Sequence, residues 1–249
     1  MKDSSDRRWV ALDGAYNFRD LGGYSAGAGT RVRWGSVFRS DSLHYLSAGD
    51  VEVLAGLGVD RIIDLRSPDE VRAVGRGALA AGPIDYVDAP VIPSATGEAT
   101  GAPPGDDIAG RYLWYLDVGR DALVDVFERL AEPRRGAVVF HCSAGKDRTG
   151  VVAALLLAML DVDDDDISAD YALTDRVLPA ILERLAADPV YRVAVGQKPA
   201  DRRTVRPDTM VRFLRLLGDE YGGARAWAEK AGVASTSIDA LRVRLRATA

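Results

Sequence analysis

The sequence is poor in the residues that several classes of protein site require. It has one cysteine among 249 residues, so neither an intramolecular disulfide nor an internal dithiol redox pair can form. It has two histidines, His44 and His141, which argues against a histidine-rich metal site. No Gly-x-Ser-x-Gly motif is present to support a Ser-His-Asp hydrolase. We therefore expect no metal and no cofactor.

Long apolar runs are also missing. The longest, at residues 151–160, falls well short of the roughly 20 residues that a membrane-spanning helix needs. The first eight residues are polar and contain no apolar segment of a secretory signal. We expect a cytoplasmic protein without integral membrane contact, although export by an unmarked route would leave the same sequence.

Positive charge is in deficit, since 32 Lys and Arg face 37 Asp and Glu for a net charge of −5. This balance does not favour a nucleic-acid partner or an anionic membrane surface. A local basic stretch contains Lys198, Arg202, Arg203 and Arg206. It is interpreted as a solvated loop, with guidance of anionic substrates as the alternative.

Strand-like and helix-like segments alternate along the chain, which predicts an α/β fold. We expect a parallel sheet of four or five strands flanked by helices. Strands are predicted at residues 59–65, 84–89 and 137–140, and residues 31–39 are predicted to be a strand or one arm of a hairpin. Helices are predicted at residues 47–58, 111–131 with a break near Gly119, 149–160, 207–221, 224–231 and 237–246, with another after an N-cap at Ser67. Residues 1–249 are predicted to form a single domain. Residues 90–110 are predicted to be a loop, and residues 161–206 a helical lid.

Residues 141–150 join a predicted strand to a predicted helix. The backbone N–H groups of such a loop have no helical partners and can converge on an anion, and Gly145 allows a tight turn. A phosphate group is the expected ligand, because its oxygens need several donors. The expected phosphate-binding residues are Ser143, Ala144, Gly145, Lys146, Arg148 and Thr149.

Cys142 begins this loop and is the expected nucleophile. The helix N-terminus and the cations of Lys146 and Arg148 favour the thiolate form. Arg148 can hold two phosphate oxygens in a bidentate fork, more strongly as charge develops in the transition state. Thr149 can donate to the thiolate as it leaves the phosphoenzyme.

A departing alkoxide or phenoxide needs a proton, and two carboxyl groups are candidates for the general acid. Asp147 lies within the loop. Asp64 ends another predicted strand, where α/β sheets place functional groups. Either could then deprotonate the water that hydrolyses a phosphocysteine, and both candidates stay open at this point.

The motif from Cys142 to Thr149, Cys-x5-Arg-Thr, resembles the signature of protein tyrosine phosphatases. Its fuller form, HCSAGKDRTG, is similar to the bacterial branch with broad specificity for phosphotyrosine, phosphoserine/threonine and phosphoinositides. Further segments resemble that branch in the same order along the chain, at residues 17–20, 38–40, 64–67, 170–171 and 221–223.

The resemblance implies a metal-independent phosphatase that acts through a phosphocysteine. It makes Cys142 the nucleophile, Arg148 the phosphate clamp and Asp147 the acid. Lys146 would attract additional phosphates, and a helical lid would match residues 161–206. Three classes of phosphorylated substrate remain: phosphoproteins, phosphoinositides, and small metabolites such as sugar or nucleotide phosphates.

Two other functions were weighed against this one. A rhodanese-like sulfurtransferase also uses a cysteine in an anion-binding loop, but an acid followed by Arg148 and Thr149 favours phosphate. A phosphate-binding module without catalysis usually lacks the cysteine or the arginine, and here both are present.

Other polar and aromatic residues are interpreted as supporting structure. His141 is expected to orient the loop, and four residues near the N-terminus are expected to brace it: Asn17, Arg19, Asp20 and Arg39. Tyr112, Trp114 and Tyr115 are interpreted as core residues; the alternative is that they line the mouth of the pocket with Arg111.

Overall fold

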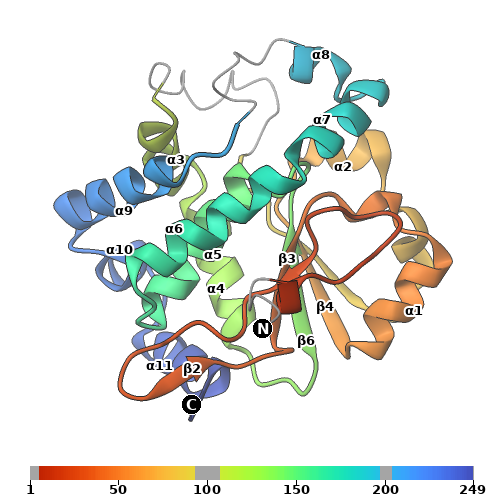
Figure 1. The fold of residues 1–249 in the computed structure, drawn as a ribbon. Coiled ribbons are helices and arrows are strands. Elements are labelled where there is room, and N and C mark those ends of the chain that lie inside the picture. The colour runs from red at the N-terminus through yellow and green to blue at the C-terminus, as the bar shows by residue number, and fades with distance from the viewer. Residues whose placement is uncertain (1–5, 93–106, 197–203, 249) are drawn as a thin grey trace.

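The computed structural model describes residues 6–92, 107–196 and 204–248. Its centre is a five-stranded sheet in the order β1-β3-β6-β4-β5 (Figure 1). The strands are β1 (Arg19–Asp20), β3 (Val37–Ser40), β4 (Val59–Asp64), β5 (Asp85–Asp88) and β6 (Ala137–His141). Four of them run parallel, and β1 pairs antiparallel with β3 at one edge. The predicted α/β class is confirmed, and the antiparallel edge strand is an addition to it.

Helices cover both faces of the sheet because its central strand is apolar on both sides. In β6, Val138 and Phe140 face one core, whereas Ala137 and Val139 face the other. The first core includes α5 (Asp147–Met159), and the second includes α1 (Ala48–Gly56) (Figure 1). This double coverage explains why β6 is a continuous apolar run.

The other helices on the α5 side come from the middle and the end of the chain. They are α3 (Ile108–Val118), α4 (Arg120–Ala131), α6 (Asp164–Leu173), α9 (Pro207–Tyr221), α10 (Ala224–Ala231) and α11 (Ser235–Leu245). The predicted break near Gly119 separates α3 from α4. A Cβ atom at Gly119 would lie 2.4 Å from the carbonyl oxygen of Val91, so glycine is required by this close approach.

The segment predicted as a lid is a series of short helices rather than one long helix. After α6 come η4 (Thr174–Arg176), α7 (Leu178–Ala187) and α8 (Arg192–Gly196). The interruption falls at Thr174, a buried residue whose hydroxyl accepts hydrogen bonds from Asn17 and Arg19. The predicted lid continues into residues 197–203, which lie outside the described residues together with most of the predicted loop at residues 90–110 and with Lys198, Arg202 and Arg203.

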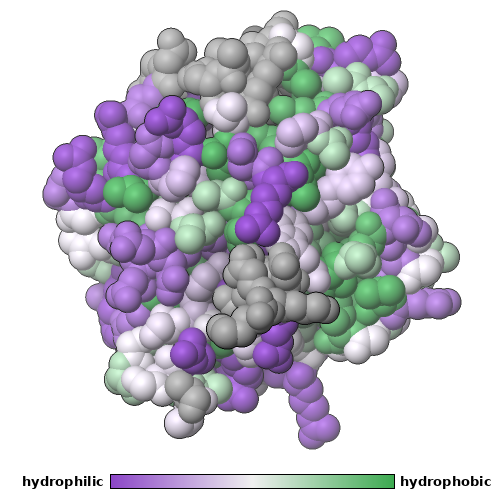
Figure 2. Space-filling model, in the orientation of Figure 1, coloured by the Kyte–Doolittle hydropathy of each residue, from purple (hydrophilic) through white to green (hydrophobic). Residues whose placement is uncertain are grey.

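The remaining elements are short. They are η1 (Asp6–Arg8), η2 (Leu43–Tyr45), α2 (Pro68–Val74), η3 (Gly77–Ala81), β2 (Thr30–Val32) and β7 (Arg246–Thr248), of which β2 and β7 form a two-stranded antiparallel sheet. The single element predicted at residues 31–39 is therefore divided between β2 and β3, which belong to different sheets. None of the helices described here is long and apolar enough to cross a membrane. Figure 2 shows hydrophilic residues interspersed with smaller hydrophobic groups over one face of the molecule.

Candidate active site

The loop that carries Cys142 lies where the carboxyl ends of three parallel strands meet. It follows β6 and leads into α5, which begins at Asp147. Gly145 has a φ of +65°, and a Cβ atom there would lie 2.6 Å from the carbonyl oxygen of Ser40 at the end of β3. Glycine is therefore needed both for the turn and for the close contact with the neighbouring strand.

Side chains from the N-terminal third hold the loop in place. The Asn17 Nδ2 atom donates to the carbonyl oxygen of Gly145 at 3.1 Å, and Arg39 Nη2 donates to the same oxygen at 2.8 Å. Arg39 and Arg19 both form buried salt bridges with Asp170 on α6, at 2.6 and 3.0 Å. Burial alone would raise the pKa of Asp170, but these two arginines hold it below its usual range.

The predicted bracing role is therefore observed for Asn17 and Arg39, and Arg19 contributes through Asp170. Asp20 does something else: its carboxylate accepts the backbone N–H groups of Gly22 and Gly35, both at 2.7 Å. It thus ties together the two ends of the segment between β1 and β3 and does not contact the loop of Cys142 through these bonds.

Cys142 lines a pocket of about 460 Å³ together with four other residues of the loop region: Ser143, Ala144, Asp147 and Arg148. The expected nucleophile, one expected acid and the expected phosphate clamp thus share one cavity. Cys142 is 2% exposed, so its sulfur is reached only through this pocket.

Three predicted phosphate-binding residues are not among those that line the pocket: Gly145, Lys146 and Thr149. Lys146 is 3% exposed, and its Nζ atom lies 3.8 Å from Asp147 Oδ1. The Thr149 hydroxyl is buried with no hydrogen-bond partner in the described structure.

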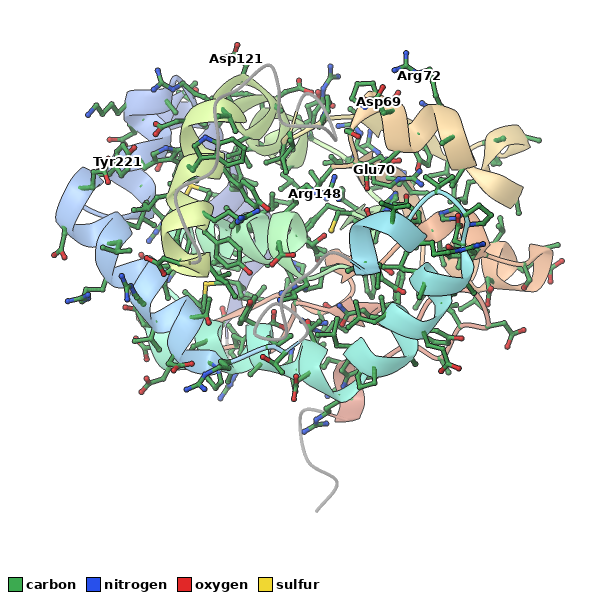
Figure 3. The ribbon with its side chains drawn as sticks, turned by 90° about the horizontal axis from the view of Figure 1, so that it is seen from above. Asp69, Glu70, Arg72, Asp121, Arg148 and Tyr221 are labelled. Atoms are coloured by element: carbon green, nitrogen blue, oxygen red, sulfur yellow. The ribbon has the colours of Figure 1, made fainter. Side chains whose placement is uncertain are left out.

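Arg148 is held by Glu70, a residue that our sequence analysis did not place in the site. Arg148 Nη1 and Nη2 lie 2.6 and 3.0 Å from the two carboxylate oxygens of Glu70, and Nη2 donates to Ser143 Oγ at 2.8 Å. The Ser143 hydroxyl donates in turn to Glu70. Glu70 and Arg148 lie close together in Figure 3, between α2 and α5. A bidentate pair of this kind fixes the direction of the guanidinium.

Glu70 reaches this position because of the start of α2. Ser67 caps the helix by accepting from the backbone N–H of Glu70, and the Glu70 carboxylate accepts from the backbone N–H of Ser67 at 2.8 Å. Burial would raise the pKa of Glu70, but the charge and hydrogen bonds of Arg148 lower it to about 2. The capping motif was visible in the sequence, whereas the contact with Arg148 was not.

Asp147 receives a hydrogen bond from a buried tyrosine. The Tyr112 hydroxyl donates to Asp147 Oδ1 at 2.7 Å, and a second hydroxyl, that of Tyr171, lies 2.7 Å from the Tyr112 oxygen. Burial and the nearby Asp147 carboxylate raise the pKa of Tyr112 well above its ordinary value, so its proton stays available to donate. Tyr112 is a core residue, as predicted, that also orients a group in the pocket.

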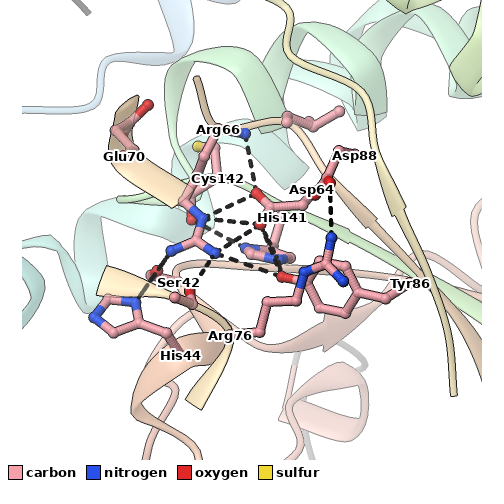
Figure 4. A network of polar contacts seen from close by, with 12 residues as sticks. Ser42, His44, Asp64, Arg66, Glu70, Arg76, Tyr86, Asp88, His141 and Cys142 are labelled. Atoms are coloured by element: carbon pink, nitrogen blue, oxygen red, sulfur yellow. Dashed lines mark hydrogen bonds and ion pairs between the residues drawn. The ribbon is translucent and has the colours of Figure 1, made fainter. Parts of the chain in front are cut away.

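Asp64 lies in a buried polar network behind the loop and is not among the residues that line the pocket (Figure 4). Its carboxylate pairs with Arg66 at 2.6 Å and accepts from the Tyr86 hydroxyl at 2.8 Å. Burial opposes ionisation, yet His141 and Arg66 keep the pKa of Asp64 well below its usual range. Burial lowers the pKa of His141 to about 4, and Tyr86 lies 3.1 Å from its Nε2 atom.

The walls of the pocket are largely apolar. Residues from the predicted lid, on and between α7 and α8, contribute Leu185, Val190, Tyr191 and Val195, and the opposite side contributes Ile92, Ile108 and Tyr115. Arg111 lines the pocket as well, whereas Trp114 does not. Within the described residues, no three His, Cys, Asp or Glu side chains are grouped as ligands of a metal ion.

A buried cysteine and an arginine on one strand-to-helix loop, at the carboxyl edge of a parallel sheet, form the arrangement expected of a cysteine-dependent phosphatase. The chain belongs to the tyrosine phosphatase family, whose model matches residues 10–247. It is thus a phosphoric monoester hydrolase, as the resemblance in its sequence predicted.

Three relatives show how widely the similarity extends. A tyrosine-protein phosphatase of Nostoc commune is 32% identical over 83% of this chain and 73% of its own length. A triple specificity protein phosphatase of Mycobacterium tuberculosis is 28% identical over 93% of this chain and 96% of its own length. A Cupriavidus necator protein named as a tyrosine-protein phosphatase is 38% identical over 66% of this chain, and the match spans just 62% of that relative.

Proposed function

We propose that this protein hydrolyses phosphomonoesters, phosphotyrosine above all, through a phosphocysteine on Cys142. The observation that carries the proposal is the shared pocket of Cys142, Arg148 and Asp147. The position and chemistry of each group in this pocket indicate its role.

The reaction proceeds in two displacements at phosphorus. The Cys142 thiolate attacks the phosphorus, the bond to the ester oxygen breaks, and Asp147 gives its proton to that oxygen. Arg148, aimed by Glu70, holds the equatorial oxygens as their charge grows. Asp147, now a carboxylate, takes a proton from water, which attacks the phosphocysteine and releases inorganic phosphate and the thiolate. The Thr149 hydroxyl is free of described partners and is proposed to donate to that thiolate.

We assign the acid role to Asp147 rather than Asp64. Asp147 lines the pocket, whereas Asp64 is fully buried outside it and is held ionised by Arg66. A carboxylate locked in a buried ion pair is a poor proton donor. We propose that Asp64 serves instead to fix Arg66 and His141 behind the loop.

The apolar walls favour an aromatic phosphate ester among the three substrate classes. Leu185, Val190 and Ile108 offer surface to a phenyl ring, whereas Lys146, which was expected to attract additional phosphates, is buried and does not line the pocket. The name of the Nostoc relative, a tyrosine-protein phosphatase, supports a phosphotyrosine substrate, whereas the triple specificity in the name of the Mycobacterium relative supports a broader range of phosphoprotein substrates. Phosphoserine/threonine, phosphoinositides and small metabolites remain the alternatives.

We also propose that the reaction needs no metal, that the protein acts in the cytoplasm, and that residues 1–249 form one phosphatase domain. Residues 161–206 act as its lid, which is supported by the contribution of α7 and α8 to the pocket wall.

The test is phosphate release with a chelating agent present. The panel contains a phosphotyrosine peptide, a phosphoserine peptide, a phosphoinositide and a nucleotide monophosphate, with Cys142→Ser as the control. We expect fastest turnover of the phosphotyrosine peptide by the natural protein and none by the variant. Equal turnover by Cys142→Ser would refute the phosphocysteine mechanism, and sulfur transfer from thiosulfate without phosphate release would favour the sulfurtransferase.

A further inference from the structure

Arg111 is an arginine of the pocket without an acidic partner in the described structure. The other buried arginines near the loop are paired: Arg148 with Glu70, Arg66 with Asp64, and Arg39 with Asp170. Arg111 lies in the first turns of α3, is half-buried and lines the pocket of Cys142. Its Nε atom is shielded from solvent and has no hydrogen-bond partner among the described residues.

The neighbours of Arg111 do not compensate its charge. Asp107, at the N-terminal end of the same helix, pairs with Arg212 at 2.9 Å. Tyr115, one turn further along α3, stays un-ionised because burial raises its pKa. Ile92 and Ile108 complete this side of the pocket and are apolar. A partly buried guanidinium in such surroundings lacks the partner that buried polar groups usually have.

We propose that Arg111 binds a second anionic group of the substrate, beside the phosphate that is cleaved. This inference rests on the proposed function, because it assigns the phosphate itself to Cys142 and Arg148. The planar guanidinium suits a carboxylate or a second phosphate, which it can hold with two parallel hydrogen bonds. The apolar walls would then contact the part of the substrate that separates the two anions.

The charge of the pocket favours one carboxylate over a highly phosphorylated ligand. Its lining contains three acidic residues, Asp69, Glu70 and Asp147, and two basic ones, Arg111 and Arg148. The Glu70 carboxylate already compensates Arg148, Asp69 pairs with Arg72, and Asp147 lies 3.8 Å from the Lys146 ammonium group. The remaining cation can balance a single additional negative charge, such as an acidic side chain next to a phosphotyrosine.

The test compares matched substrates. One arm uses phosphotyrosine peptides with a Glu one to three residues before or after the phosphotyrosine, each against a twin with Gln. The other arm uses an aromatic bisphosphate against its monophosphate. For each pair we measure the ratio of kcat/KM values. The same pairs are titrated calorimetrically into Cys142→Ser protein, so that the ratio of affinities is obtained without turnover.

We expect the natural protein to prefer the Glu peptide over its Gln twin. Arg111→Met should lower this kcat/KM ratio roughly tenfold, which is the contribution expected of a hydrogen-bonded charge pair. Arg111→Lys should retain part of it. Arg120→Met, an exposed arginine on α4 outside the pocket, is the matched control. Since both members of a pair meet the same protein sample, partial unfolding of a variant does not change the ratio.

The outcomes separate the subsite from the proposed function. A preference that is lost in Arg111→Met supports the subsite. Loss in the peptide arm identifies its ligand as a carboxylate, and loss in the bisphosphate arm identifies it as a phosphate. The subsite is overturned if Arg111→Met leaves the kcat/KM ratios unchanged, or if the natural protein shows no preference in either arm. If Arg111→Met lowers the affinity ratios but protein with Cys142 intact releases no phosphate, the subsite is retained and the proposed function is rejected.

Discussion

Asp147 combines two features at the residue scale that a general acid needs: access to the pocket and a fixed orientation. It lines the pocket with Cys142, and the Tyr112 hydroxyl holds one of its oxygens at 2.7 Å. The orientation matters because a proton is transferred efficiently only over hydrogen-bond distance.

Asp147→Asn should slow the hydrolysis of esters with poor leaving groups far more than that of esters with good ones. An alkyl or unsubstituted phenyl oxygen needs the proton as it departs, whereas a nitrophenolate does not. We expect kcat to fall by about 10²-fold or more for esters with poor leaving groups and by much less for nitrophenyl esters. The measurement is kcat across a series of aryl phosphates. An equal loss throughout the series would remove Asp147 from the acid role.

Glu70→Gln should lower kcat/KM by about 10²-fold, because it removes the charge that aims the Arg148 guanidinium at the phosphate. The amide keeps the size of the side chain, so the fold should be retained. Glu183→Gln, on an exposed position of α7, is the control. Kinetics with p-nitrophenyl phosphate measure the effect, and full activity of Glu70→Gln would show that Arg148 orients itself.

At the scale of elements, two helices begin with the same capping box in different surroundings. Ser47 and Asp50 form it at α1, away from the pocket, and Ser67 and Glu70 form it at α2 beside Arg148. The second box therefore links the stability of a helix to the geometry of the site.

Ser47→Ala and Ser67→Ala should each reduce the free energy of unfolding by about 1 kcal/mol, since each removes one capping hydrogen bond. Their activities should differ, because α2 carries Glu70 and α1 carries no residue of the pocket. Urea unfolding and kcat/KM together check this. If both variants lost activity, or neither did, the cap of α2 would have no specific effect on the site.

The elements were largely predictable, because helix caps and apolar periodicity are local properties of the chain. The strands β4, β5 and β6, the caps at Ser47 and Ser67, and the break at Gly119 all follow from neighbouring residues. The interruption at Thr174 was not predictable, because it depends on hydrogen bonds from Asn17 and Arg19, far away in the sequence.

At the scale of the whole molecule, several buried groups respond to acid in the same direction. Burial lowers the pKa of both His44 and His141 from 6.5 to about 4. Arg148 lowers the pKa of Glu70 from 4.5 to about 2 against the effect of burial. In each case the unfolded chain binds a proton at a higher pH than the folded protein does.

Stability should therefore be full above pH 6.5 and fall in two stages as the pH decreases. The histidines reduce it between pH 6.5 and 4, by up to about 3 kcal/mol for His141, and Glu70 reduces it further between pH 4.5 and 2. Urea unfolding from pH 7.5 to 4 measures the first stage, and His141→Gln should flatten it. Constant stability across this range would contradict the buried neutral state of His141.

The sequence by itself determined the chemistry of the loop and the class of fold. Cys142, Asp147 and Arg148 are brought together by a strand, a tight turn and a helix that adjoin in the chain, so local rules suffice to predict them. The sequence predicted a parallel α/β arrangement but did not give the order of the strands in the sheet.

The tertiary structure decided which distant residues serve that loop. It brought Glu70 to Arg148, Tyr112 to Asp147 and Arg111 to the pocket, and it buried Asp64 behind the loop. These relations depend on how separate helices pack across the sheet. The local pattern of a sequence carries no information about such packing, because a capping glutamate or a core tyrosine has the same spacing whether or not a catalytic group lies opposite it.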